Sequence, residues 1–134
     1  MAKVLLKKSD AAGFYTGTAG EFTIQIDRTG HNVPRSIDLV LLGLGTCTIS
    51  TVSHYMERKG LPVHNLAVAL SAEYDEKEGH YKDFVISLEV DESIPAATRK
   101  IIGSIAKTCR IHKTLDARPE IAVDVAAAAR PQSS

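Results

Sequence analysis

The sequence has no tryptophan, few other aromatic residues and no excess of either charge. Aromatic residues make up 5% of its 134 residues, and sixteen Lys and Arg residues balance sixteen Asp and Glu residues. Nucleic-acid binding relies on basic patches and aromatic stacking surfaces, and binding to anionic membranes also relies on basic residues. We therefore expect neither nucleic acid nor a membrane among the partners of this protein.

We also expect no signal peptide, because the apolar run among the first eight residues is too short. The longest apolar stretch, 37–56, approaches the length of a membrane span but contains one carboxylate, one histidine and five serine or threonine side chains. A buried helix of a soluble, cytoplasmic protein explains this stretch better. The chain length suits a single domain, 1–134, with a flexible tail at 126–134.

Hydrophobic periodicity predicts an α+β domain with the element order β-β-α-β-β-α-β. Alternation of apolar and polar residues, or clusters of strand-favouring residues, predict strands at 4–8, 21–27, 65–75, 80–91 and 120–125. The third and fourth of these strands read as a β-hairpin. The residues between the first two strands have the composition of turns.

Two helices are expected between these strands. The first is expected to run from a cap at Ser36 to about Lys59. Because 37–44 is apolar almost all round, we expect this helix to be buried on most sides and packed against a largely antiparallel sheet. Gly43 and Gly45 disfavour a helix, and their presence suggests that another backbone approaches closely. The second helix is expected at about 93–109.

Cysteine is scarce, since Cys47 and Cys109 are the only two. In a reducing compartment a cysteine pair is more often catalytic than a permanent disulfide. Cys47 lies about three turns into the first helix, too far for the dipole of that helix to activate it. Arg110 and His112 give Cys109 basic surroundings that favour a thiolate, although cations are also common at helix ends. Position alone therefore favours the interpretation of each cysteine as a small buried side chain.

Two segments resemble the signatures of the OsmC/Ohr family. Residues 36–48, SIDLVLLGLGTCT, are similar to the family segment acid-Leu-Leu-(Leu/Ala)-Ala-Ala-Leu-Gly-x-Cys-Thr. Residues 109–115, CRIHKTL, resemble Cys-(Pro/Ser)-(Val/Ile)-(Ser/His)-x-(Thr/Ala)-Leu, and residues 58–63, RKGLPV, match another family feature. The likeness covers the chain from the second strand onward. It implies an OsmC-like fold and an intertwined homodimer with two active sites at the interface.

The same resemblance implies a peroxidase that reduces organic or lipid hydroperoxides without a cofactor. It assigns Cys47 as the nucleophile that attacks the peroxide and Cys109 as the resolving thiol. Attack on the O–O bond would leave a sulfenic acid on Cys47, and condensation with Cys109 would then give a disulfide. An external small dithiol or lipoyl-type reductant would regenerate both thiols by exchange.

In this family an arginine stabilises the thiolate and a carboxylate orients the arginine. By resemblance the arginine is Arg28, with Arg35 as the second choice, and the carboxylate is Asp38. Asp38 stands where a related OsmC-like branch carries its acid, one position after the glutamate of the best-studied members, where this chain has Ile37. One residue turns a helical side chain by about 100°. A first-turn acid that only complements the helix dipole is therefore an equal interpretation of Asp38.

Apolar residues around Cys47 are candidates to line a substrate pocket, although for any one of them an ordinary core role is the favoured interpretation. The candidates are Ile37, Val40, Leu41 and Leu44. His54 and His112 could join the cysteines in a metal site, but their spacing matches no zinc signature and we expect no metal. The alternative function is an OsmC-like homodimer without peroxidase activity that binds a small molecule or partner. The displaced acid and the uncertain arginine favour this alternative.

Overall fold

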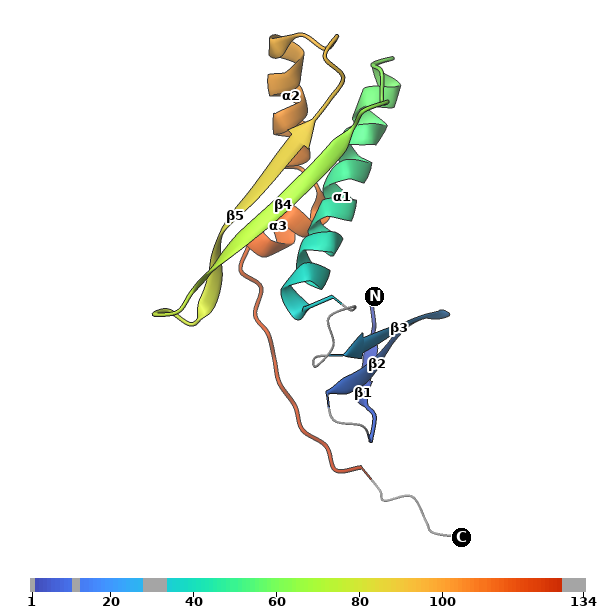
Figure 1. The fold of residues 1–134 in the computed structure, drawn as a ribbon, viewed down its shortest axis with the longest axis vertical. Coiled ribbons are helices and arrows are strands. Elements are labelled where there is room, and N and C mark those ends of the chain that lie inside the picture. Colours follow the sequence, from blue (N-terminus) through green and yellow to red (C-terminus); the bar gives the residue numbers. More distant parts are fainter. Residues whose placement is uncertain (1, 11–12, 28–33, 129–134) are drawn as a thin grey trace.

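The computed structural model describes residues 2–10, 13–27 and 34–128. Three strands are followed by a long helix, a β-hairpin and two shorter helices, so the predicted α+β class is confirmed (Figure 1). The elements are β1 Leu5–Lys8, β2 Phe14–Ala19, β3 Phe22–Asp27, α1 Ser36–Arg58, β4 Ala67–Asp75, β5 His80–Glu89, α2 Ala96–Ala106 and α3 Arg110–Asp116.

The predicted element order is wrong in three places. β2 occupies a segment that was expected to form turns, because pairing with β1 on one side and β3 on the other overrides its turn-like composition. α3 was not expected, since seven residues are too few to show a helical period. The strand expected at 120–125 is not formed in the described residues, where this segment is exposed and has no strand partner.

The strands form two antiparallel sheets. β1, β2 and β3 make one sheet, which lies beyond the N-terminal end of α1 (Figure 1). β4 and β5 make the predicted hairpin, with Val68 opposite Leu88 and Leu70 opposite Ile86. These four side chains are half-buried and alternate with exposed neighbours, so one face of the hairpin is apolar.

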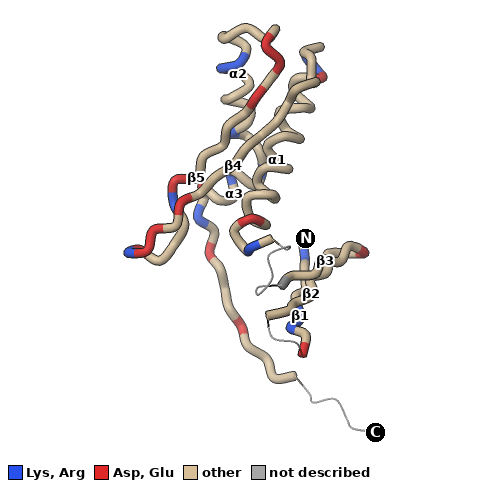
Figure 2. Tube along the Cα trace, in the orientation of Figure 1, with Lys and Arg blue, Asp and Glu red and all other residues tan. Residues whose placement is uncertain are grey.

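The core lies beside the second half of α1, which packs against α2. The buried core residues are Val52, Met56, Ile94, Ile102 and Ala106. The first half of α1 is covered less, and the side chains of Val40 and Leu42 remain 45% and 62% exposed. Between Asp38 and Glu57, α1 carries no Lys, Arg, Asp or Glu residue (Figure 2). By length and composition it is the one described helix that could cross a membrane.

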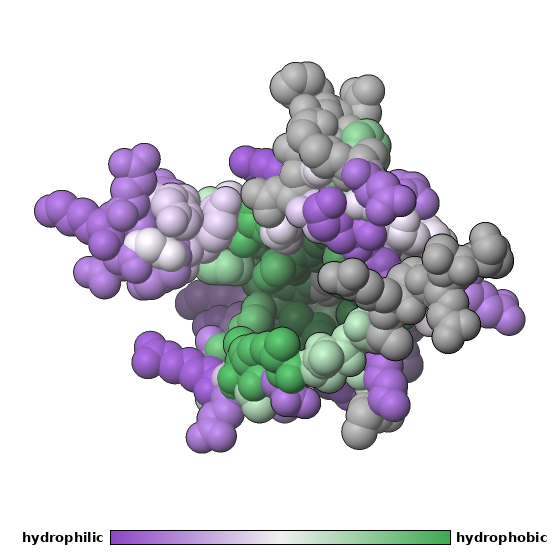
Figure 3. Space-filling view, turned by 90° about the horizontal axis from the view of Figure 1, so that it is seen from below, coloured by the Kyte–Doolittle hydropathy of each residue, from purple (hydrophilic) through white to green (hydrophobic). Residues whose placement is uncertain are grey.

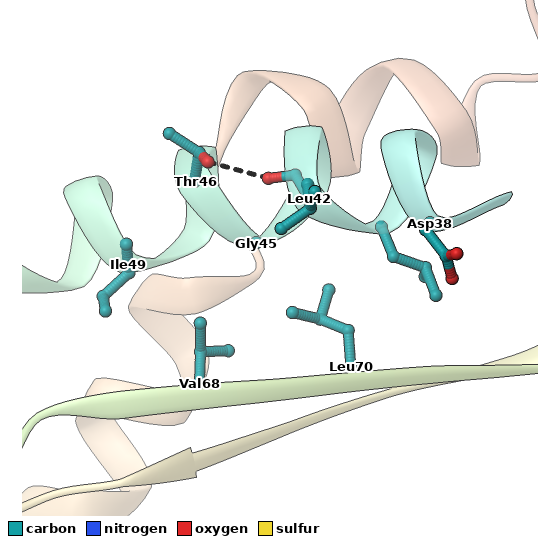
Figure 4. Close-up of a pocket in the computed structure, with 8 residues that line it drawn as sticks. Asp38, Leu42, Gly45, Thr46, Ile49, Val68 and Leu70 are labelled. Carbon is teal, nitrogen blue, oxygen red and sulfur yellow. Dashed lines mark hydrogen bonds between the residues drawn. The ribbon is translucent and has the colours of Figure 1, made fainter. Parts of the chain in front are cut away.

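Gly45 allows α1 to approach β4 closely. A Cβ atom at Gly45 would lie 2.7 Å from Cδ1 of Leu70, which points from β4 toward α1 (Figure 4). Gly45 therefore has a close neighbour, but this neighbour is a side chain and not the backbone that was expected. Gly43 has no atom within 4 Å of the equivalent position, so the same expectation is wrong there.

Candidate active site

Cys109 forms the N-cap of α3. Its backbone is extended, with φ −64° and ψ 147°, and its Sγ accepts the backbone N–H of His112 at 3.2 Å. Polar N-cap side chains satisfy one of the N–H groups that the first turn of a helix leaves unpaired, and here a sulfur does so. The side chain is 1% exposed. Cys109 is thus fixed in a buried position where α3 begins.

Cys47 lies on the side of α1 that meets α3, and its thiol reaches the first turn of α3. The pKa of the Cys47 thiol is lowered, chiefly by a hydrogen bond from the backbone N–H of Ile111. Partial burial opposes this shift, while hydrogen bonds from the side chain of Cys109, the backbone N–H of Arg110 and the side chain of Thr51 add to it. The N–H groups that activate Cys47 therefore belong to α3 and not to its own helix.

The two sulfurs form a dithiol with unequal members. Both cysteines are free, Cys47 is half-buried and Cys109 is buried. A lowered pKa increases the fraction of a thiol that is present as the reactive thiolate, while the adjacent second thiol can close a disulfide after the first is oxidised. The arrangement is chemically suited to two-electron thiol oxidation.

The model of the protein family described as OsmC-like protein matches residues 29–124 of the chain. The chain belongs to the OsmC-like protein family. No curated protein matches the sequence significantly.

Solved structures of OsmC-like proteins share this fold. An OsmC-like protein from Mycoplasma pneumoniae matches with a TM-score of 0.75 at 15% identity, covering 87% of each chain. The organic hydroperoxide resistance protein OhrB of Bacillus subtilis matches with a TM-score of 0.58 at 19% identity, covering 85% of this chain and 89% of its own. An OsmC-like hydroperoxide resistance protein from Jannaschia sp. CCS1 matches with a TM-score of 0.53 at 18% identity, covering 88% and 87%. At these identities the likeness shows the fold.

Asp38 and Arg35, two of the charged residues expected at the OsmC-like site, do not join Cys47 in this chain. Asp38 precedes Cys47 by nine residues, which places it on the opposite side of α1, about 180° away. It instead accepts hydrogen bonds from Arg35 Nε and Nη2, both at 3.1 Å. These hydrogen bonds lower the pKa of Asp38 and raise that of Arg35. Arg28 lies outside the described residues.

Asp38 also sets the start of α1. Its carboxylate accepts the backbone N–H of Arg35 at 2.9 Å, and Arg35, not Ser36, is the cap residue. The expected cap is therefore displaced by one residue. The structure favours the interpretation of Asp38 as a first-turn acid that pairs with the start of its helix.

The four residues expected around the substrate do not share one cavity. Leu41 and Asp38 line a cavity of about 470 Å³ between α1 and β4 (Figure 4). Leu44 lines a separate cavity of about 370 Å³ between α1, β5 and α3. Ile37 is half-buried, and Val40 is exposed in the single chain.

Sequence reasoning missed the two groups that contact the cysteines most directly. The backbone N–H groups at the start of α3 carry no sequence signal, because α3 itself was not expected. Thr48 contacts Cys109. Its position next to Cys47 in the family-like segment is the sequence signal that could have identified it as a site residue. His112 pairs through Nε2 with Asp116 at 3.3 Å. Among the described residues, no group of three or more His, Cys, Asp or Glu side chains comes together as a metal site would require.

Proposed function

We propose that this protein is a thiol-dependent peroxidase that reduces organic or lipid hydroperoxides to alcohols. The observation that supports this most directly is the Cys47 thiol, whose pKa is lowered at the start of α3 beside the buried Cys109. A thiolate in contact with a second thiol is what such a reaction requires. The hydroperoxide resistance proteins among its structural neighbours are consistent with this chemistry.

The reaction proceeds in three balanced steps. The Cys47 thiolate attacks the outer peroxide oxygen, the O–O bond breaks, and the departing alkoxide takes a proton to become the alcohol. Cys109 then displaces hydroxide from the Cys47 sulfenic acid, which gives a disulfide and water. An external dithiol reduces the disulfide by exchange, and is itself oxidised to a disulfide. A small or lipoyl-type dithiol suits this last step in the cytoplasm, where we place the protein.

We also propose that the working form is a homodimer, because the single chain leaves much apolar surface open. Seen from below, apolar side chains gather in a hollow that projecting hydrophilic segments surround (Figure 3). In the segment after α3, Ile121, Val123 and Val125 alternate with polar or small residues and are 85–89% exposed. A segment of this pattern pairs readily with an open sheet edge of a second copy. The apolar first half of α1 would also be covered by such a partner.

The test follows the consumption of cumene hydroperoxide with a dithiol reductant. We expect Cys47→Ser to abolish consumption and Cys109→Ser to leave a single oxidation of Cys47 without catalytic turnover. Light scattering on the same samples reports the oligomeric state. Equal rates for the wild type and Cys47→Ser would end the peroxidase proposal.

The second candidate is an OsmC-like protein that binds a small molecule or partner without peroxidase activity. The Arg35–Asp38 pair favours it, because these charges neutralise each other on the side of α1 away from Cys47. This candidate predicts that neither cysteine is oxidised by stoichiometric hydroperoxide. A thiol titration before and after exposure to peroxide separates the two candidates.

A further inference from the structure

Thr48 is fully buried and contacts the sulfur of Cys109. Its hydroxyl donates to the carbonyl of Leu44 at 2.8 Å, one turn earlier in α1. The same oxygen lies 3.7 Å from Cys109 Sγ. A hydroxyl has one proton to donate and two lone pairs to accept with. While that proton is engaged by Leu44, the oxygen can still accept from Cys109, whose single S–H can be directed to Thr48 or to the Cys47 sulfur.

Ionisation of Cys109 poses a problem that this contact can solve. The thiol is 1% exposed, so water cannot solvate the thiolate that must attack Cys47. The N–H of His112 is one donor to the sulfur. A hydroxyl that rotates away from Leu44 becomes a second donor, since it can accept from a thiol and donate to a thiolate.

We propose that Thr48 is a positioning residue for the resolving thiol, holding Cys109 toward Cys47 and donating to its thiolate as the disulfide closes. The inference rests on the proposed function and assigns a further residue to it. In this step the electron pair of the Cys109 thiolate forms the S–S bond, and the S–O bond of the sulfenic acid breaks. The oxygen leaves as hydroxide and recovers, as water, the proton that Cys109 gave up. Cys109 is oxidised by one electron equivalent and Cys47 is reduced by one.

Thr46 provides a matched control on the same helix. Its hydroxyl donates to the carbonyl of Leu42 at 2.7 Å, the same hydrogen bond across one turn that Thr48 makes. Thr46 is exposed, and its side chain points away from β4 in Figure 4. Replacement of either threonine by valine therefore changes the helix in the same way, but only Thr48→Val alters the surroundings of Cys109.

The experiment measures the nucleophilicity of Cys109 without relying on peroxide. An aromatic disulfide reagent, DTNB, first forms a mixed disulfide at Cys47, and attack by Cys109 then releases a second thionitrobenzoate. We expect Thr48→Val and Thr48→Ala to slow this second release about tenfold, because a hydrogen bond to a charged group is lost. Thr46→Val and Thr48→Ser should retain the wild-type rate. Circular dichroism verifies that each variant is folded.

The pH profile separates a chemical role from a structural one. Loss of a hydrogen-bond donor to the Cys109 thiolate should shift the increase in the rate of the second thionitrobenzoate release to higher pH. The rate of the first release should not change. On α3 the titratable side chains are Arg110, His112, Lys113 and Asp116. On α1 they are Asp38, Cys47, His54, Tyr55, Glu57 and Arg58, and all of these residues are kept in every variant. In a second experiment, one equivalent of cumene hydroperoxide is added and the Cys47 sulfenic acid is trapped with dimedone. The sulfenic acid should persist longer in Thr48→Val than in the wild type.

The two proposals fail in different ways. If the second DTNB release is equally fast in Thr48→Val and Thr46→Val, or is absent from the wild type, the role of Thr48 is overturned. If the DTNB result is as expected but peroxide oxidises neither cysteine, the peroxidase proposal fails and the role of Thr48 toward Cys109 stands.

Discussion

Replacement of Cys109 by serine or alanine separates its role as a helix cap from its role as a thiol. The sulfur accepts the N–H of His112 at the start of α3. A serine hydroxyl is a strong N-cap and alanine has no capping group, and the difference in stability is about 1 kcal/mol. Neither variant can form a disulfide. We therefore expect Cys109→Ala to be less stable than Cys109→Ser by about 1 kcal/mol.

Urea unfolding under reducing conditions measures this difference. Both variants are compared at one protein concentration, because association with a second copy would raise the apparent stability. With a slope of about 2 kcal/mol per molar urea, the midpoint of the alanine variant should be lower by about 0.5 M. Hydrogen exchange should show the loss of protection at the His112 amide. Equal midpoints, with equal exchange at this amide, would refute a capping role for the sulfur.

Two further predictions concern stability away from the cysteines. The Ser93 hydroxyl is the main cause that lowers the pKa of Asp91 from 3.8 to about 2. The ionised Asp91 side chain therefore stabilises the fold above pH 3.8, and this stabilisation is lost as the pH falls toward 2. The stability gap between wild type and Asp91→Asn, measured by urea unfolding, should therefore shrink across this range, and a constant gap would contradict the assignment. In thermal unfolding, Gly43→Ala should be stabilising by about 1 kcal/mol. Gly45→Ala should be less stable than Gly43→Ala, because its Cβ would meet Leu70; equal melting temperatures would argue against that contact.

Elements defined by local sequence were predicted well, and elements that depend on distant partners were not. α1 begins one residue before its expected start and ends at Arg58, close to its expected end, because Gly60 adopts a positive φ of 69° that terminates a helix. The hairpin follows its alternating pattern. β2 contains Gly17 and was read as a turn, although pairing on both sides makes it a strand. The segment 120–125 has a strand pattern, but a strand also needs an edge to pair with.

The candidate site shows the same division. The two cysteines could be predicted because family-like segments surround them. The groups that act on them could not, since the N–H groups of Arg110 and Ile111 meet Cys47 only through the packing of α3 on α1. Asp38 was expected at the site by analogy along the sequence. Its position on α1 instead directs its side chain away from Cys47 and toward Arg35.

The double use of the Cys109 sulfur bears on how sequences of this kind diverge. A cysteine codon becomes a serine codon by a single-nucleotide change, and serine would keep α3 capped. A lineage can thus lose the second thiol and keep the fold, leaving Cys47 facing the same helix. The Cys109 sulfur therefore serves both reactivity and stability. A change to serine removes the reactive thiol and preserves the stabilising cap of α3.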